Sequence, residues 1–322
     1  MKAVFIEQPG GIDAMRYGDF PTPQPAPGEV LVKIAYSGVN FIDTYHRSGL
    51  YKLPLPAVLG SEASGTVEKL GDGVTGLKPG DRVAYTLARG SYADYQAVPA
   101  SNLVGIPEGV DDASAAASML QGCTAHYLTH STFPLKRGQT TLVHAAAGGT
   151  GRLIVQMATM IGARVIATVG SEAKAKLTLS DGASDAILYN TQDFVAETKR
   201  LTDGKGVDVV YDGVGQATLL KGFDCLKPRG MMVAFGNASG PAAPVDLLML
   251  SQKGSLYVTR PTLFTYIASR EDLEWRSSDM FRGIGEGKLK INIDKIYPLT
   301  EAAQAHRDLE GRKTTGKLLL KI

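Results

Sequence analysis

The stretch His144-Ala145-Ala146-Ala147-Gly148-Gly149-Thr150-Gly151 decides the fold of this 322-residue chain. It fits the dinucleotide-binding pattern G-x-G-x-x-G, with alanine at the first position. Ala146 still permits a tight turn there, Gly148 lets a backbone approach a pyrophosphate, and Gly151 lets a helix pack close on the preceding strand. A helix that begins at Gly149 would direct its unpaired N–H groups and its positive dipole end at the phosphates.

The residues on either side supply the context that this pattern needs. Residues 140–144 read as a strand, residues 153–161 place apolar side chains on one helical face, and Gly162 stands where a helix C-cap belongs. Further strands are expected at 164–169, 186–189, 207–211, 231–235 and 255–258. Strands separated by helix-length segments predict an α/β fold with a doubly wound parallel sheet, the Rossmann arrangement.

The two ends of the chain have a different character. The first 120 or so residues carry short strand signals at 30–34, 65–70 and 81–85, with glycine- and proline-rich turns between them, which predicts a compact β-rich domain. After about residue 265 the alternation stops, and only a helix at 301–309 and a strand at 316–322 are expected.

The residues at the end of the second strand of the doubly wound unit indicate whether the cofactor is NAD or NADP. In NAD-binding proteins an acid about 20 residues past the glycines binds the ribose 2′-hydroxyl, but residues 169–171 are Val-Gly-Ser and Glu172 comes later. Ser171 and Lys174 suit a 2′-phosphate, which favours NADP. The alternative is that Ser171 only caps the next helix and Lys174 is a solvated surface side chain; capping and phosphate binding are compatible.

The composition is that of a globular protein and argues against nucleic-acid binding, a membrane span and a disulfide framework. Hydrophobic residues make up 44% of the chain, and the net charge of +2 gives no reason to expect nucleic-acid binding. No apolar run approaches the roughly 20 residues that span a bilayer. The two cysteines, Cys123 and Cys225, cannot form a disulfide framework and are interpreted as small buried residues in a cytoplasmic protein.

Several strings together resemble the quinone oxidoreductases, the zeta-crystallin branch of the zinc-free medium-chain dehydrogenase/reductase family. The resemblance covers essentially the whole chain and rests on residues 38–45, 47–51, 59–62, 121–125, 144–151, 235–240 and 258–261. It implies a Rossmann NADPH-binding domain, residues 125–264, inserted in a GroES-like catalytic domain, residues 1–124 and 265–322. It also implies reduction of a quinone by NADPH, with the nicotinamide between the domains.

The resemblance further implies which residues act. It places Asn40, Asp43, Tyr45 and Tyr51 at the substrate. It places on the cofactor, besides the fingerprint residues, Thr150, Ser171, Lys174, Tyr189, Asn237, Arg260 and Arg312. From the residues alone, Asn40 and Asp43 equally fit a turn after a strand, and the tyrosines fit a core. His46 and Arg47 are interpreted as surface residues.

A zinc site is not expected. Zinc enzymes of this family need about three protein ligands, whereas Ser37 and Ser61 stand where the resemblance places cysteine and histidine. The i,i+4 pair His126 and His130 is interpreted as a partly exposed helical pair. Without a Lewis acid an easily reduced acceptor is favoured, with Tyr45 and Asn40 donating hydrogen bonds to its developing oxyanion.

Two other functions stay open at this point. One is an NADPH-dependent enone or enoyl-thioester reductase on the same fold; the other is a non-catalytic NADPH-binding structural or RNA-binding protein, which the absence of a basic run disfavours. A homodimer is expected through the strand at Ser255–Val258, because an apolar edge strand is a template for a second copy and related enzymes pair there.

Overall fold

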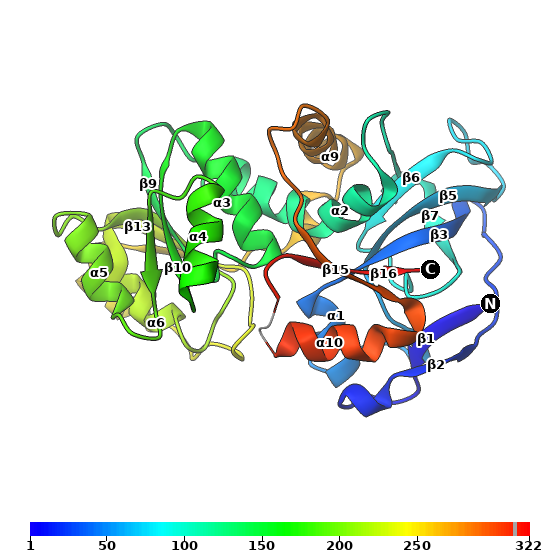
Figure 1. The fold of residues 1–322 in the computed structure, drawn as a ribbon, viewed down its shortest axis with the longest axis horizontal. Helices are drawn as coiled ribbons and strands as arrows, with labels where there is room; N and C mark the ends of the chain where they lie inside the picture. Colours follow the sequence, from blue (N-terminus) through cyan, green and yellow to red (C-terminus); the bar gives the residue numbers. More distant parts are fainter. Residues whose placement is uncertain (312–313) are drawn as a thin grey trace. The chain divides into compact units, whose positions relative to one another are not determined.

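The computed structural model describes residues 1–311 and 314–322 of the chain. These residues form two compact units (Figure 1). One unit consists of Met1–Cys123 together with Ile267–Ile322, and the other is Thr124–Tyr266.

The second unit is built on one six-stranded sheet. Its strands are β9 (Thr140–Val143), β10 (Arg164–Val169), β11 (Asp185–Leu188), β12 (Val207–Asp212), β13 (Leu226–Ala234) and β14 (Tyr257–Thr259). All neighbouring strands pair in parallel, in the order β11-β10-β9-β12-β13-β14. Starting from β9, this is the 3-2-1-4-5-6 order of a dinucleotide-binding sheet. The predicted Rossmann domain is therefore confirmed.

Helices connect these strands and cover the sheet. They are α3 (Gly149–Ile161), α4 (Glu172–Ser180), α5 (Phe194–Leu201), α6 (Leu219–Gly222), α7 (Leu247–Gln252) and α8 (Leu263–Tyr266). Figure 1 shows α3 and α4 along one face of the sheet. Because helices cover both faces, β12 is buried along its entire length.

The local signals around the fingerprint are borne out. Helix α3 begins at Gly149 and ends at Ile161, and the C-cap residue is Gly162, which has the left-handed φ of 90° typical of that position. Ser171 is the N-cap of α4, and its hydroxyl accepts a hydrogen bond from the Lys174 N–H at 3.4 Å.

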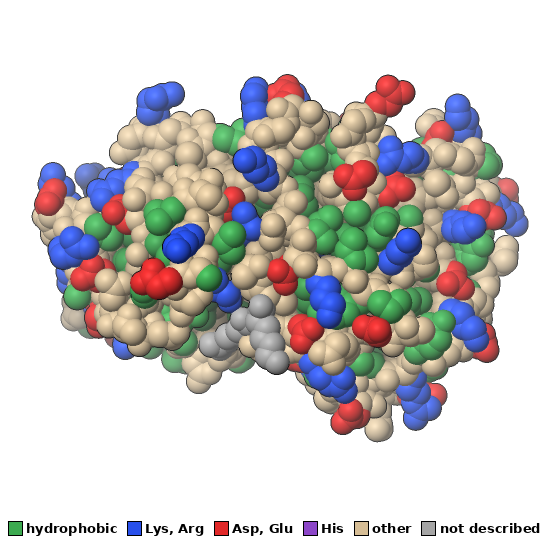
Figure 2. All heavy atoms as spheres, in the orientation of Figure 1, with side chains coloured by type: hydrophobic (Ala, Val, Ile, Leu, Met, Phe, Trp, Pro, Cys, Tyr) green, Lys and Arg blue, Asp and Glu red, His purple; other side chains and the backbone are tan. Residues whose placement is uncertain are grey.

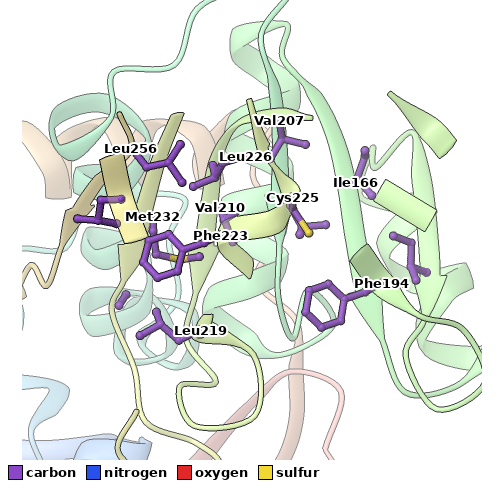
Figure 3. Packing of buried hydrophobic residues seen from close by; sticks show 14 residues of the cluster. Ile166, Phe194, Val207, Val210, Leu219, Phe223, Cys225, Leu226, Met232 and Leu256 are labelled. Atoms are coloured by element: carbon purple, nitrogen blue, oxygen red, sulfur yellow. The ribbon is translucent and has the colours of Figure 1, made fainter. Parts of the chain in front are cut away.

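A cluster of apolar side chains forms the core of this unit under α5 and α6. Figure 3 shows Leu219, Phe223 and Met232 grouped together, and each is at most 4% exposed. Complete burial of one such side chain contributes about 1.5–3 kcal/mol.

The first unit is β-rich. Its larger sheet contains β3 (Glu29–Val39), β5 (Glu62–Leu70), β6 (Arg82–Thr86), β7 (Tyr95–Pro99), β8 (Val104–Gly105), β15 (Ile293–Pro298) and β16 (Lys317–Lys321). A smaller sheet contains β1 (Lys2–Ile6), β2 (Arg16–Asp19) and β4 (Ala57–Val58). Its helices are α1 (Phe41–Ser48), α9 (Arg270–Gly285) and α10 (Ala302–Glu310); α2 (Asp112–Tyr127) crosses the boundary in the chain between the units.

Two features after residue 265 differ from the sequence prediction. Helix α9 and strand β15 were not expected there. The buried face of α9 includes Arg276 and Ser277 between Leu273 and Met280, so polar residues interrupt the apolar period that would have revealed it. Strand β14 also begins at Tyr257 rather than Ser255, whose φ of 57° is left-handed.

Candidate functional site

Asn40 and Asp43 lie at the N-terminus of α1. Asn40 is the N-cap residue, and its backbone N–H donates to Asp43 Oδ2 at 2.8 Å. The other Asp43 oxygen accepts from the Ser61 hydroxyl at 2.6 Å. Asp43 is fully buried and Asn40 is 3% exposed. Asp43 therefore caps the N-terminus of α1, as a residue of a turn often does. Unlike most such residues, it does so while fully buried.

The Asn40 side chain belongs to a buried polar cluster. Its Nδ2 donates to Glu62 Oε1 at 2.7 Å, and its Oδ1 accepts from Lys317 Nζ at 2.6 Å and from Gln121 Nε2 at 3.3 Å. Lys317 also forms an ion pair with Glu62, whose second oxygen accepts from the Leu120 N–H at 2.5 Å. These contacts fix which way the amide faces. Sequence reasoning missed Lys317, because it lies 277 positions from Asn40.

Two glycines make room for this cluster. A Cβ on Gly38 would lie 2.1 Å from Glu62 Oε1. Gly60 has a φ of +94°, and a Cβ there would lie 2.4 Å from Cδ1 of Tyr92. Both positions therefore require glycine, which explains the glycine in each of the strings at 38–45 and 59–62.

The two candidate tyrosines lie together and outside the core. The rings of Tyr45 and Tyr51 meet edge to face with centroids 5.4 Å apart. Tyr51 is 38% exposed and Tyr45 is half-buried. Neither is the core aromatic that the sequence alone allowed. The structure thus places Asn40, Asp43 and Tyr45 at the N-terminal end of α1, with Tyr51 beside Tyr45.

The fingerprint loop has the close packing that its glycines predict. A Cβ on Gly151 would lie 2.4 Å from the Ala145 carbonyl oxygen and 2.8 Å from Ala146 Cα. Ala145 itself has a left-handed φ of 50°, and Gly148 is the N-cap of α3. The N–H groups of the first turn, including those of Gly149 and Thr150, have no partner within the helix and can receive an anion.

A second group of candidate residues meets at the carboxyl end of β10. The Tyr189 hydroxyl packs on Gly170, where a Cβ would lie 2.7 Å from it. Ser171 follows directly, exposed at the start of α4, and Lys174 is half-buried one turn later. Asn190, which sequence reasoning missed, donates its Nδ2 to the Gly170 carbonyl at 2.7 Å. The absence of an acid from 169–171 fits a 2′-phosphate, and so do the residue types at this strand end, namely the Tyr189 hydroxyl, Ser171 and Lys174.

Asn237 and Arg260 lie at the carboxyl ends of neighbouring strands. Arg260 Nη1 donates to the Ala234 carbonyl at 2.9 Å. With the Asn237 amide turned so that its Nδ2 donates to Gly236 at 2.9 Å, its Oδ1 accepts from Arg260 at 3.3 Å. Arg312, the remaining candidate, lies outside the described residues.

Several side-chain interpretations were wrong. Arg47 is 4% exposed rather than a surface residue, because it forms an ion pair with Glu310 at 2.8 Å. His126 is 2% exposed, whereas His130, on which its ring stacks at 4.2 Å, is partly exposed, so the interpretation as a partly exposed pair is wrong for His126 only. The interpretation of both cysteines as buried residues is, by contrast, confirmed, and burial raises the pKa of the Cys123 thiol to about 12.

A metal does not fit this donor set. In the described part of the chain no three His, Cys, Asp or Glu side chains form a group that could hold a metal ion. The buried carboxylates Asp43 and Glu62 already accept from Ser61, Asn40 and Lys317. A dinucleotide does fit, since the turn at Gly148–Gly151 offers N–H groups and the Ser171–Tyr189 corner offers hydroxyls.

Comparison with family models agrees with both units. Residues 26–108 match the alcohol dehydrogenase GroES-like domain, and residues 182–320 match a model described as zinc-binding dehydrogenase. Together with the observed sheets, these matches confirm the predicted fold class.

Known proteins resemble the chain over its whole length. A quinone oxidoreductase of Pseudomonas aeruginosa is 46% identical over 97% of this chain and 96% of its own. A 2-haloacrylate reductase of a Burkholderia species is 42% identical over 99% of this chain and 98% of its own. The structure of an Escherichia coli quinone oxidoreductase in complex with NADPH matches with a TM-score of 0.98, at 43% identity and 100% coverage of both chains. The protein therefore belongs to the quinone oxidoreductases of the medium-chain dehydrogenase/reductase family.

Proposed function

We propose that this chain is an NADPH:quinone oxidoreductase. The observation that carries the cofactor choice is the end of β10, where the Tyr189 hydroxyl packs on Gly170, Ser171 caps α4 one turn before Lys174, and no acid stands at 169–171. Family membership supports the acceptor class. We assign Ser171, Lys174, Tyr189 and Arg312 to the 2′-phosphate, and the turn from Ala146 to Gly151 to the pyrophosphate.

Bound NADPH supplies the reducing equivalents for this reaction. The chain contributes position and hydrogen bonds. Tyr45, half-buried beside Tyr51, can donate its hydroxyl proton to the oxygen on which charge develops. The Asn40 amide is fixed by Glu62 and Lys317, and its Nδ2 also donates to the Gly38 carbonyl at 3.5 Å, a long hydrogen bond that one to the acceptor oxygen would replace. Asp43 holds the N-terminus of α1, and Asn237 and Arg260 order the turn that follows β13.

The acceptor is tested by following NADPH and NADH oxidation with quinones, enones, enoyl thioesters and a 2-haloacrylate. We expect turnover with NADPH and quinones, unchanged by a metal chelator. Faster turnover of an enone, thioester or acrylate than of every quinone would overturn the proposed acceptor class. Loss of activity with the chelator would overturn the metal-free chemistry.

A homodimer formed through β14 is part of this proposal. This strand is the edge of the sheet, and Tyr257 and Val258 on it are 57% and 37% exposed. Unpaired N–H and C=O groups beside exposed apolar side chains are a template for a second copy of the same strand. The pairing would join two parallel sheets into one.

The remaining assignments concern the domains and the cell. We assign catalysis to residues 1–124 with 265–322 and NADPH binding to 125–264, and we propose a cytoplasmic location because both cysteines are free and buried. In the described residues no helix is both long and apolar enough to cross a membrane. On the face shown in Figure 2, basic and acidic side chains are interspersed, which gives no support to nucleic-acid binding.

A further inference from the structure

A row of buried hydrogen bonds runs from Asp43 to the far side of α10. Tyr92, in the loop before β7, has its hydroxyl 3.2 Å from Asp43 Oδ2 and 3.2 Å from His306 Nε2. The other nitrogen of His306, Nδ1, lies 3.1 Å from Arg47 Nη1. Arg47 in turn donates to both oxygens of Glu310 at 2.8 and 3.1 Å. Tyr92 and His306 are fully buried and have no role in the function proposed above.

The chemistry of these groups fixes the direction of every bond. A guanidinium has only donors, so Nδ1 of His306 is the acceptor and carries no proton. Burial and the Arg47 charge lower the pKa of His306 to about 3, so the ring is neutral and its proton is on Nε2. This N–H donates to the Tyr92 oxygen, which leaves the Tyr92 hydroxyl proton for Asp43. In every hydrogen bond of the row, the donor therefore lies on the Arg47 side and the acceptor on the Asp43 side. The opposite direction is excluded because Arg47 cannot accept a hydrogen bond.

We propose that Tyr92 and His306 are positioning residues, which form with Arg47 a one-way hydrogen-bond relay that holds Asp43 as the carboxylate capping α1. Asp43 accepts three hydrogen bonds, from Ser61, the Asn40 N–H and Tyr92, and donates none. The relay ties α1, with Asn40 and Tyr45, to α10 and to the loop before β7. Its relevance to catalysis rests on the proposed function.

The charges around Asp43 make the relay sensitive to pH. Burial raises the pKa of Asp43 to about 6; hydrogen bonds from Ser61 and Asn40 and the Lys317 charge act against burial, whereas the Glu62 charge acts with it. The Tyr92 hydroxyl and, beyond it, neutral His306 face the same carboxylate. The folded-state pKa lies above the value of about 3.9 in an unfolded chain, so ionised Asp43 disfavours folding. Each donor offsets this cost only above about pH 6.

Thermal unfolding of the full chain without cofactor tests the relay. Tyr92→Phe removes one donor and should lower the Tm more at pH 8 than at pH 5, where Asp43 is protonated. Tyr85→Phe is the matched control, because Tyr85 is equally buried and donates to Gln96 at 2.7 Å, away from Asp43. Its cost should be the same at both pH values. An equal, pH-independent cost for both variants would overturn the relay.

Kinetics supply the second readout. In Tyr92→Phe the acid limb of the kcat/KM profile for a quinone should move to higher pH, with activity relative to wild type roughly threefold or more lower at pH 6 than at pH 8. Tyr85→Phe should follow the wild-type profile. Wild-type protein that reduces no quinone would remove the proposed function, whereas the unfolding experiment would still decide the relay. An unmoved acid limb in an active Tyr92→Phe enzyme would contradict the positioning role.

Discussion

Lys317 and Glu62 form an ion pair that is closed to solvent: their side chains are 1% and 0% exposed. The pair joins the first residue of β16 to the first residue of β5 and holds the Asn40 amide between them. Burying two charges is costly, and only good geometry with further hydrogen bonds compensates for it. Here Asn40 and the Leu120 N–H supply those bonds.

Breaking this pair should therefore destabilise the protein strongly. Lys317→Met leaves Glu62 charged and unpaired, and we expect a loss of about 3–5 kcal/mol in the free energy of unfolding. Adding Glu62→Gln should restore much of it. The exposed pair of Lys288 and Glu286 is the control, and Lys288→Met should leave stability almost unchanged. Urea unfolding measures all four proteins; a cost for Lys317→Met no larger than for Lys288→Met would refute the account.

The fingerprint turn should not tolerate a side chain at its third glycine. In Gly151→Ala the new Cβ meets the Ala145 carbonyl oxygen at 2.4 Å. Overpacking of this kind costs about 1–3 kcal/mol and should also weaken NADPH binding. A Cβ at Gly285, at the end of α9, meets nothing within 4 Å, so Gly285→Ala should be neutral or stabilising. If both variants melt at the wild-type temperature and bind NADPH equally, the close packing does not matter.

The substrate role of α1 is tested with Tyr45. Tyr45→Phe keeps the ring against Tyr51 but removes the hydroxyl, and kcat/KM for a quinone should fall about tenfold, as expected for one charge-assisted hydrogen bond. The Kd for NADPH should stay within about twofold. Tyr17→Phe, on the exposed strand β2, serves as the control. Equal losses in NADPH affinity and turnover would place Tyr45 on the cofactor instead.

The dimer is tested on the edge of the Rossmann sheet. Tyr257→Lys adds a charge to β14, which is how natural proteins keep edge strands apart. Sedimentation at micromolar concentration should show a dimer for wild type and a monomer for this variant. Tyr17→Lys changes the exposed edge strand β2 of the other unit and should stay dimeric. A monomeric wild type, or dissociation only by Tyr17→Lys, would show that the wrong edge was chosen.

The sequence predicted those features that depend on neighbouring residues. The helix start at Gly149, the Gly162 cap and the Ser171 cap each depend on a few adjacent positions, and all three are borne out. The parallel sheet was also predicted correctly, because strands joined by helix-length connections leave few arrangements other than parallel pairing. Helix α9 was missed because Arg276 and Ser277 occupy positions on its buried face.

The polar clusters were beyond sequence reasoning because their members are far apart in the chain. Arg47 looks like a surface residue until Glu310, 263 positions away, is placed beside it. Lys317 and His306 likewise become meaningful only when the C-terminal segment returns beside α1 and β3. Family resemblance identified Asn40 and Asp43, but not the partners that hold them.

The measurement that tests the central claim most directly is titration of NADPH and NADH into wild type and Lys174→Ala. A hydrogen bond to a charged group contributes about 1.5–3 kcal/mol, so Lys174→Ala should weaken NADPH binding about tenfold or more. NADH, which lacks the 2′-phosphate, should bind wild type more weakly than NADPH does and bind both proteins alike. Lys176→Ala, two residues further along the same helix and exposed, should match wild type. Wild-type protein that binds NADH as tightly as NADPH, or a Lys174→Ala variant that weakens both cofactors equally, would contradict the account.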